Sequence, residues 1–191
     1  MTYGFYLDMK SCTGCRTCQI ACKDKNDLPI GVLHRRVETY EAGEFPKPGL
    51  YHLSRTCNHC ENPACVSNCP TGAMYQDEET GTVQHRDDEC IGCQTCVNSC
   101  PYEIPQYFED DKIVRKCDMC MDLVRAGENP ACVDACMLRA LEWGDVAELA
   151  AKHSDAVRDM AVLPDSSQTG PRALYTVTDD ALKDSYARKY I

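Results

Sequence analysis

The residues of this chain whose type and spacing could do chemistry are its 16 cysteines. The most regular group runs from Cys90 to Pro101, where cysteines at positions 90, 93, 96 and 100 are followed directly by proline. At this Cys-x2-Cys-x2-Cys-x3-Cys-Pro spacing thiolates hold iron–sulfur clusters. The first three bind one cluster, and the fourth binds a second cluster beside it. Proline suits the next position because the first turn of a helix leaves its N–H groups unpaired.

Three further groups vary this pattern, and no cysteine lies outside a group. They are Cys12, Cys15, Cys18 and Cys22; Cys57, Cys60, Cys65 and Cys69; and Cys117, Cys120, Cys132 and Cys136. The first and third groups (that of Cys90) share one spacing, whereas the second and fourth share Glu-Asn-Pro-Ala-Cys-Val, at residues 61–66 and 128–133. An insert at residues 121–127 distinguishes the fourth group from the second. The chain therefore contains two copies of a two-cluster unit.

Zinc and disulfides are the competing chemistries for these thiols. Structural zinc sites use two separated Cys-x2-Cys pairs and need neither a third thiol two residues later nor a closing Cys-Pro. Disulfide frameworks belong mainly to short exported chains, and Met1–Asp8 has neither a charged nor an apolar signal region. We therefore expect four 4Fe–4S clusters in place of zinc or disulfides.

The composition limits the classes of partner. With 191 residues but only three Phe and one Trp, the chain has a thin apolar core that inorganic clusters would complete. A formal charge of −10 without a basic run makes nucleic acid an unfavourable partner. No window reaches the roughly 20 apolar residues of a membrane span. We expect a cytoplasmic protein, or one held at either face of a membrane by its partners, with no signal peptide and no transmembrane segment of its own.

Short elements must position the cysteines. Alternation and turn residues predict the following elements: strands at 2–8, 36–40, 50–55, 82–85, 112–116 and 173–177, a helix at 146–153 capped by Asp145, further helix at 155–163, and a hairpin or covering loop at 26–48. This mixture of short strands and helices predicts an α+β fold. Spacing alone leaves two pairings open. The groups could pair first with second and third with fourth, or first with fourth and second with third.

Several motifs together resemble one known family. They are Tyr3-Gly-Phe, Cys12-Thr-Gly-Cys15, Cys57-Asn-His-Cys60, Cys69-Pro-Thr-Gly-Ala-Met74, Cys90-Ile-Gly-Cys93, Cys100-Pro-Tyr102, Pro105-Gln-Tyr107 and Arg139-Ala-Leu141. Over residues 3–141 the sequence resembles the four-cluster iron–sulfur subunit of the dimethyl sulfoxide reductase family of molybdopterin oxidoreductases. Met137 departs from the family pattern, which usually has proline there, but no ligand is lost.

The resemblance implies the nested pairing of groups. The implied ligand sets are Cys12, Cys15, Cys18 and Cys136 for cluster 1; Cys117, Cys120, Cys132 and Cys22 for cluster 2; Cys57, Cys60, Cys65 and Cys100 for cluster 3; and Cys90, Cys93, Cys96 and Cys69 for cluster 4. Some relatives lose a ligand in the third group and hold a 3Fe–4S cluster. Here that group is complete, so four 4Fe–4S clusters are expected.

The implied fold is two interleaved bacterial-ferredoxin-like units with a C-terminal extension. Residues 1–56, with the first cysteine group and the covering hairpin, would pair with residues 112–144, which hold the fourth group. Residues 57–111 would form the inner unit, and residues 145–191 a partner-docking extension. The clusters would form a line, with cluster 1 facing the catalytic subunit and cluster 4 facing the electron donor.

The implied function is electron transfer without catalysis. Single electrons would pass through the clusters from a quinol-oxidising membrane subunit or other donor to a molybdopterin subunit that reduces a small substrate such as a sulfoxide, during anaerobic respiration. Alternatives are the same subunit in a soluble reductive dehydroxylase or formate-oxidising complex, a free polyferredoxin carrier, and a structural zinc protein.

Some charged residues beside the cysteines have two interpretations. The basic residues that flank the groups are Lys23, Arg55, Arg115, Lys116 and Arg139. A nearby positive charge would favour the reduced cluster and raise its reduction potential, but ordinary pairing with surface acids explains such residues equally well. His59 and His85 could contact a quinone or carry a proton, although packing roles are the simpler interpretation.

Overall fold

The first strand of the chain is the centre of the main sheet. In a computed structural model, which describes residues 1–189, β1 (Tyr3–Asp8) lies between β8 (Leu141–Asp145) and β9 (Ala173–Thr176), in the order β8-β1-β9. It is antiparallel to β8 and parallel to β9. Its middle four residues are all buried, because both faces of the strand are covered. The predicted strand at 2–8 is confirmed.

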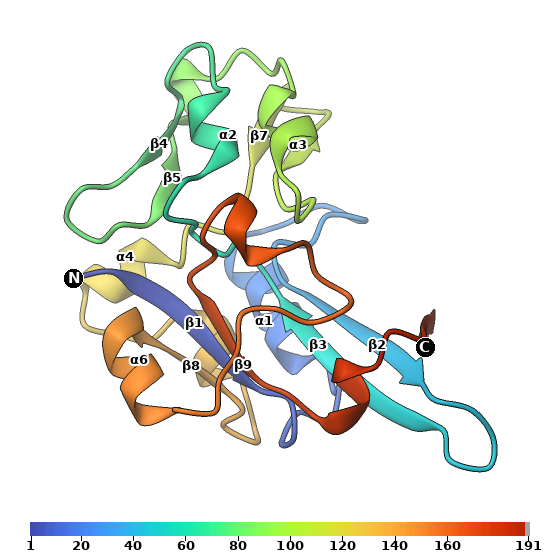
Figure 1. The fold of residues 1–191 in the computed structure, drawn as a ribbon. Coiled ribbons are helices and arrows are strands. Elements are labelled where there is room, and N and C mark those ends of the chain that lie inside the picture. Colours follow the sequence, from blue (N-terminus) through green and yellow to red (C-terminus); the bar gives the residue numbers. More distant parts are fainter. Residues whose placement is uncertain (190–191) are drawn as a thin grey trace.

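A long hairpin forms the second sheet. Its strands β2 (Arg36–Ala42) and β3 (Gly49–Arg55) pair antiparallel, and β10 (Tyr186–Lys189) adds a third strand beside β2. Figure 1 shows the hairpin projecting away from the rest of the molecule. The predicted strands at 36–40 and 50–55 are therefore confirmed, but the hairpin spans 36–55, and of the segment 26–48 only the part from Arg36 onward belongs to it.

Two short hairpins and two short helices build the upper lobe of Figure 1. The hairpins consist of β4 (Met74–Gln76) with β5 (Val83–His85), and of β6 (Gln106–Phe108) with β7 (Ile113–Arg115). The helices are α2 (Ala64–Ser67) and α3 (Thr95–Ser99), which pack against each other. A 3-10 turn, η1 (Asp87–Glu89), leads into the third cysteine group. The second and third cysteine groups thus lie together in this lobe.

The first and fourth cysteine groups meet in the lower body. Helix α1 (Thr17–Lys25) carries two cysteines of the first group and packs against α5 (Ala131–Asp134) of the fourth. Helix α4 (Met121–Arg125) is formed by the insert that lengthens the fourth group. These helices are short, so tertiary packing and not helix propensity holds them in place.

The last third of the chain supplies strands to both three-stranded sheets. Helix α6 (Val146–Lys152) forms as predicted, and the Asp145 carboxylate accepts hydrogen bonds from Ala147 N at 2.9 Å and from Thr2 N at 2.8 Å. The predicted helix at 155–163 is wrong. Val157 instead exchanges two backbone hydrogen bonds with Tyr175 of β9. This antiparallel bridge requires an extended backbone at Val157, which a helix does not allow.

Two 3-10 turns complete the tail, η2 (Ser166–Gln168) and η3 (Asp179–Leu182). β9 and β10 each pair with strands from the first third of the chain, so the tail lies against the part of the chain that carries the cysteines. The domain boundary at residue 145 stays a prediction. Whether the tail also contacts a partner stays a prediction.

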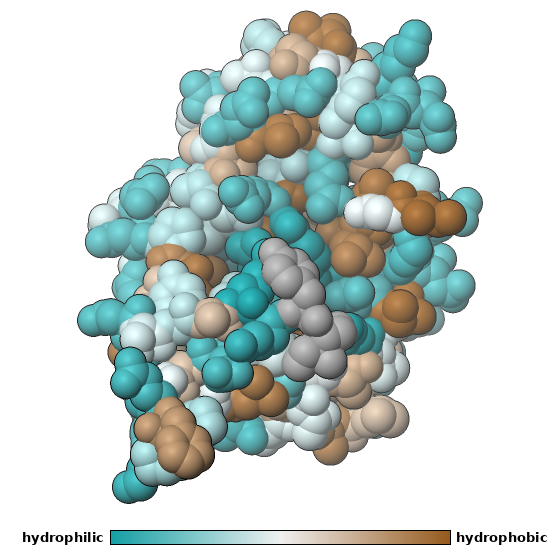
Figure 2. All heavy atoms as spheres, turned by 90° about the vertical axis from the view of Figure 1, so that its right-hand side faces the viewer, coloured by the Kyte–Doolittle hydropathy of each residue, from teal (hydrophilic) through white to brown (hydrophobic). Residues whose placement is uncertain are grey.

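Cysteines make up part of the apolar core. In the upper lobe the buried core consists of Cys65, Met74, Val83, Cys96 and Val114. So small a set of apolar side chains stabilises little on its own, as expected where clusters complete the interior. Figure 2 shows a face that is mostly hydrophilic, with hydrophobic residues in separate patches. Among the described residues no helix is long and apolar enough to cross a membrane.

Candidate iron–sulfur centres

Each cysteine group opens with a Cys-x2-Cys turn that contains a left-handed residue before its second cysteine. The φ angles are 69° at Gly14, 44° at His59, 66° at Gly92 and 66° at Met119. Glycine adopts this conformation freely, whereas histidine and methionine do so at a cost that marks functional turns. Left-handed residues in such turns direct successive backbone N–H groups to one side, which forms a nest for an anion.

Backbone N–H groups reach sulfur atoms at two places. In the opening turn of the fourth group Met119 N lies 3.4 Å from Cys117 Sγ, and after the last cysteine of the second group Met74 N lies 3.4 Å from Cys69 Sγ. Such contacts stabilise a thiolate and, in a cluster, the added negative charge of the reduced state. The turn geometry therefore suits negatively charged sulfur and not only chain reversal.

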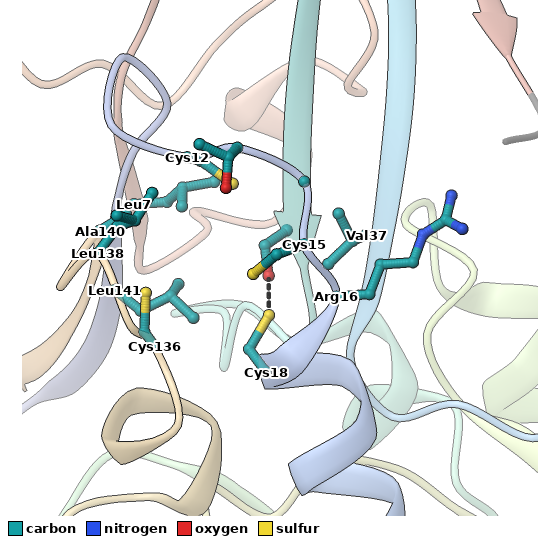
Figure 3. Close-up of a pocket in the computed structure, with 13 residues that line it drawn as sticks. Leu7, Cys12, Cys15, Arg16, Cys18, Val37, Cys136, Leu138, Ala140 and Leu141 are labelled. Atoms are coloured by element: carbon teal, nitrogen blue, oxygen red, sulfur yellow. Dashed lines mark hydrogen bonds between the residues drawn. The ribbon is translucent and has the colours of Figure 1, made fainter.

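The first site lies where the N-terminal loop and α1 meet the segment after α5. Its lining cysteines are Cys12, Cys15, Cys18 and Cys136. Figure 3 shows their side chains arranged around one shared space. Leu7 and Leu141 line the same pocket with apolar groups. Cys15 is exposed, and the Thr17 hydroxyl, 3.4 Å from its sulfur, lowers the pKa of that thiol.

A second pocket lies in the upper lobe, between the segment that follows α2 and the loop that leads into α3. Its lining cysteines are Cys69, Cys90, Cys93 and Cys96. Burial raises the pKa of Cys96 to about 11, and the nearby thiols of Cys69 and Cys90 act in the same direction. Cys93 is exposed, and its hydrogen bond with Thr95 lowers its pKa. This pocket thus repeats the pattern of the first site, with one thiol at the surface.

Two further sets contain no exposed thiol. One set consists of Cys22, Cys117, Cys120 and Cys132, all buried. Burial raises the pKa of Cys22, and Cys117 and Cys132 raise it further. The other set consists of Cys57, Cys60, Cys65 and Cys100. Burial raises the pKa of Cys65 to about 12, and Cys57 contributes most among its charged neighbours.

The structure therefore brings the thiols of each nested set near one another, and which cluster each cysteine holds stays a prediction. Cys18 and Cys22 lie one turn apart on α1 but face different sets. Burial and Asp118 raise the pKa of Cys117 most, and Cys57 raises it further, so a thiol of the third set lies near a thiol of the second.

The donor chemistry of the four sets fits 4Fe–4S clusters. Each set offers four sulfur atoms, which is the number such a cluster takes. Among residues 1–189 no three His, Cys, Asp or Glu side chains are arranged to hold a single metal ion. Buried thiols with raised pKa values need a positive partner to become thiolates, and iron ions supply that charge. When bound, the clusters supply one-electron redox chemistry.

Sequence reasoning missed two residues at these sites. Thr169, from the tail, donates its hydroxyl to Cys60 Sγ at 3.2 Å and is almost fully buried. Arg35, 2% exposed, lies among cysteines of the first two sets. Nothing local in the sequence distinguishes Arg35 from Arg36, and Thr169 lies in a loop far along the chain from any cysteine group.

The flanking basic residues have different environments. Lys116 is buried and donates to the carbonyl oxygen of Cys117 at 3.0 Å. The others hold local structure or pair with acids: Lys23 donates to Leu28 O, Arg139 to Asp134 O, Arg55 pairs with Glu38, and Arg115 pairs with Asp87 and Asp111. The surface-pairing interpretation thus holds for Arg115.

The two histidines have structural partners. His59 is fully buried and its Nδ1 accepts a hydrogen bond from Val83 N at 3.0 Å. Burial holds its pKa well below the ordinary value, so the ring is neutral. His85 pairs with Asp87. Both contacts fit the packing interpretation.

Comparison with known proteins agrees with this geometry. A family model described as a 4Fe-4S dicluster domain matches residues 49–146, and one described as a 4Fe-4S binding domain matches residues 9–25. The B subunit of the anaerobic dimethyl sulfoxide reductase of Escherichia coli (strain K12) is 45% identical over 177 residues, covering 88% of this sequence and 85% of that relative.

Other relatives extend the same picture. The B subunit of the anaerobic dimethyl sulfoxide reductase of Haemophilus influenzae is 42% identical over 178 residues, covering 88% of this sequence and 86% of the relative. Protein NrfC of Escherichia coli (strain K12) is 38% identical over 146 residues, covering 75% and 66%. The α+β ferredoxin-like fold, the four 4Fe–4S clusters and the non-catalytic role are all confirmed. The chain belongs to the family of iron–sulfur electron-transfer subunits represented by the B subunit of anaerobic dimethyl sulfoxide reductase.

Proposed function

We propose that each nested set of cysteines holds one 4Fe–4S cluster and that the four form a series for single electrons. The proposed ligands are Cys12, Cys15, Cys18 and Cys136 for cluster 1; Cys22, Cys117, Cys120 and Cys132 for cluster 2; Cys57, Cys60, Cys65 and Cys100 for cluster 3; and Cys69, Cys90, Cys93 and Cys96 for cluster 4. The single observation that carries the proposal is that each end set has one exposed thiol, Cys15 or Cys93, whereas neither middle set has an exposed thiol.

Short elements support this order. Helix α1 carries ligands of clusters 1 and 2, and α3 leads from Cys96 of cluster 4 to Cys100 of cluster 3. The proximity of Cys57 to Cys117 joins clusters 2 and 3. A continuous series 1–2–3–4 results, in which electrons enter at one exposed end and leave at the other.

Exposed apolar residues lie at both ends of the series. Met137, 70% exposed, and Leu138 follow Cys136 of cluster 1, and Ile91, 66% exposed, lies within the first turn of cluster 4. Such side chains beside a redox centre favour docking of another protein. We assign the cluster 1 end to a molybdopterin catalytic subunit that reduces a sulfoxide or similar small compound, and the cluster 4 end to a membrane quinol-oxidising subunit or other donor.

Co-purification tests the partner assignment. Anaerobic isolation of the tagged full-length protein from its own cells is expected to recover a molybdopterin protein and a membrane protein, identified by mass spectrometry. A molybdopterin protein with full activity and no membrane protein would support the soluble alternative. Recovery of the protein alone, as a monomer that exchanges electrons with several enzymes, would support the free carrier.

Paired cysteine substitutions test the ligand sets. Cys18→Ser and Cys22→Ser are neighbours on α1, yet each is expected to alter a different EPR signal of the reduced protein. Cys22→Ser is expected to alter the same signal as Cys117→Ser. If Cys22→Ser instead alters the signal that Cys57→Ser alters, the first group pairs with the second and the nested assignment is wrong.

A further inference from the structure

Arg35 is a buried cation without a carboxylate partner. It lies in the loop just before β2, is 2% exposed, and is the largest fully buried side chain among the described residues. Its Nη1 donates to Ser54 Oγ at 3.1 Å, and its guanidinium carbon lies 4.7 Å from the centroid of the Phe5 ring. Within residues 1–189 it forms no ion pair with an acid, and its Nη2 has no hydrogen-bond partner. A fixed charge in this position requires a counter-charge nearby.

The neighbours that supply negative charge are cysteines from two different sets. Burial alone would lower the pKa of Arg35, but Cys132, Cys18, Cys117 and Cys22, as thiolates, raise it above its ordinary value. Cys18 belongs to the first site, and the other three belong to the second. Ser54 strengthens the link, because its Oγ lies 3.1 Å from Arg35 Nη1 and 3.4 Å from Cys18 Sγ. The Arg35 side chain also contacts the side chain of Cys132, so it adjoins the first site through Ser54 and the second site through Cys132.

We propose that Arg35 is the shared counter-cation of clusters 1 and 2 and that its charge raises the reduction potential of both. The inference rests on the ligand sets proposed above. Each reduction adds one electron, taken from the adjacent carrier, and neither forms nor breaks a bond. A positive charge that is shielded from water favours the more negative, reduced state more strongly than a surface charge does. One side chain thereby couples the potentials of two centres.

The neighbouring residue offers a matched control. Arg36 comes next and lies at the start of β2, but its Nη2 donates to the carbonyl oxygen of Glu103. It is only partly buried, and the main charged neighbours that act on its pKa are Glu38, Glu103 and two arginines, and not cysteines. Arg36→Gln thus removes the same charge from the same segment without removing it from beside the two sites.

The test is an EPR-monitored redox titration of the complete clustered protein with its co-purified partners. Signals are first assigned with Cys18→Ser and Cys22→Ser. Arg35→Gln is expected to change the ratio of reduced to oxidised cluster at a fixed potential at least about tenfold, a fall of about 59 mV for a one-electron couple. This fall is expected for clusters 1 and 2 and not for clusters 3 and 4. Arg36→Gln and Arg35→Lys are expected to titrate like the unaltered protein.

Iron analysis distinguishes the possible failures. If Arg35→Gln retains four clusters with unchanged potentials, the proposed role of Arg35 is wrong and the proposed ligand sets still stand. A fall in all four potentials would overturn it as well, because the effect would not be local. If the cysteine variants fail to separate the signals of clusters 1 and 2, the ligand assignment itself is wrong. If Arg35→Gln does not retain its clusters, Arg35→Lys decides, since a fall in potential there would show that charge is not what matters.

Discussion

A hydroxyl group from the C-terminal part of the chain reaches the third cysteine set. Thr169 donates to Cys60 Sγ at 3.2 Å, and its loop is held by backbone hydrogen bonds from Glu61 N to Gly170 O and from Asn62 N to Thr169 O. Hydrogen bonds to cluster sulfur stabilise the reduced state. A single residue outside the cysteine groups therefore acts on one centre.

Thr169→Val is expected to lower the potential of cluster 3 and to shift its reduced fraction a few-fold, while the iron content stays complete. The valine keeps the shape of the side chain but removes the donor. EPR titration measures the shift, and Ser166→Ala, which removes a hydroxyl bound to Asp159 instead of to sulfur, is the control. An unchanged cluster 3 potential would show that the hydroxyl has only a packing role.

His34 connects a single side chain to the pH dependence of folding. It is 6% exposed, neither ring nitrogen has a hydrogen-bond partner within residues 1–189, and burial lowers its pKa to about 4. Because the folded-state pKa is below the unfolded value of 6.5, the unfolded protein binds the proton more readily. Stability is therefore lost as the pH falls below about 6.5, by an amount on the order of 1 kcal/mol at pH 5.5.

His34→Phe is expected to remove this part of the pH dependence. Denaturant unfolding of the anaerobic protein at pH 7.5 and pH 5.5 measures it. The variant is expected to lose less stability between the two pH values than the unaltered protein loses. Equal losses in both would contradict a neutral His34 in the folded state.

At the scale of elements, the start of α6 is tied to the start of the chain. The Asp145 carboxylate caps α6 through Ala147 N and also accepts from Thr2 N beside β1. These hydrogen bonds lower the pKa of Asp145, and the bond from Thr2 is the largest cause. A carboxyl whose folded-state pKa is depressed stabilises the fold above its unfolded pKa, and this contribution is lost only as the pH falls through the folded value.

Asp145→Ala is expected to lower the thermal midpoint by about 2–4 °C, the range for loss of one helix cap in a protein of this size. Because both pKa values lie well below 5.5, the loss is expected to be equal at pH 7.5 and pH 5.5. Calorimetry at both pH values measures it, with Glu148→Ala as the control in the same helix. A loss that has already halved at pH 5.5 would be inconsistent with the lowered pKa.

The sequence predicted most of the short elements for definite reasons. Alternation identified β1, β3 and β5, and Asp145 identified the start of α6. The helix predicted at 155–163 failed because Val157 pairs with a strand distant in the sequence, and local propensity does not contain that information.

The cysteine groups could be identified from the sequence, whereas the roles of Arg35 and Thr169 could not. Ligand spacing is local, so it is visible in the sequence. The positions of a buried cation and of a hydroxyl donor depend on tertiary packing. Likewise, glycine indicates the left-handed conformation at Gly14 and Gly92, but nothing in the sequence indicates it at His59 and Met119. The nested pairing of the four cysteine groups was predicted from the family resemblance and not from spacing.

At the scale of the whole molecule, the tail belongs to the cluster-bearing body. It supplies β9 beside β1, β10 beside β2, and the Thr169 hydroxyl at Cys60. A partner-docking role for residues 145–191 remains compatible with this arrangement, but the tail also completes the core.

Truncation after residue 164 separates the two roles. Removal of β9 exposes the buried edge of β1 and removes the donor to Cys60, so we expect a loss of iron and a lower midpoint of unfolding in the isolated protein. Iron analysis and thermal unfolding measure both. Retention of all clusters with loss of partner binding alone would show that the tail is only a docking element.

The pairing of the first strand with late strands has a consequence for biosynthesis. With the ligand sets proposed above, centres 3 and 4 are complete once the ribosome has made Cys100, whereas centres 1 and 2 wait for Cys136 and Cys132. β1 stays without either sheet neighbour until β8 and then β9 emerge. The thiols made first therefore belong to the centres whose ligand sets are completed last, late in translation.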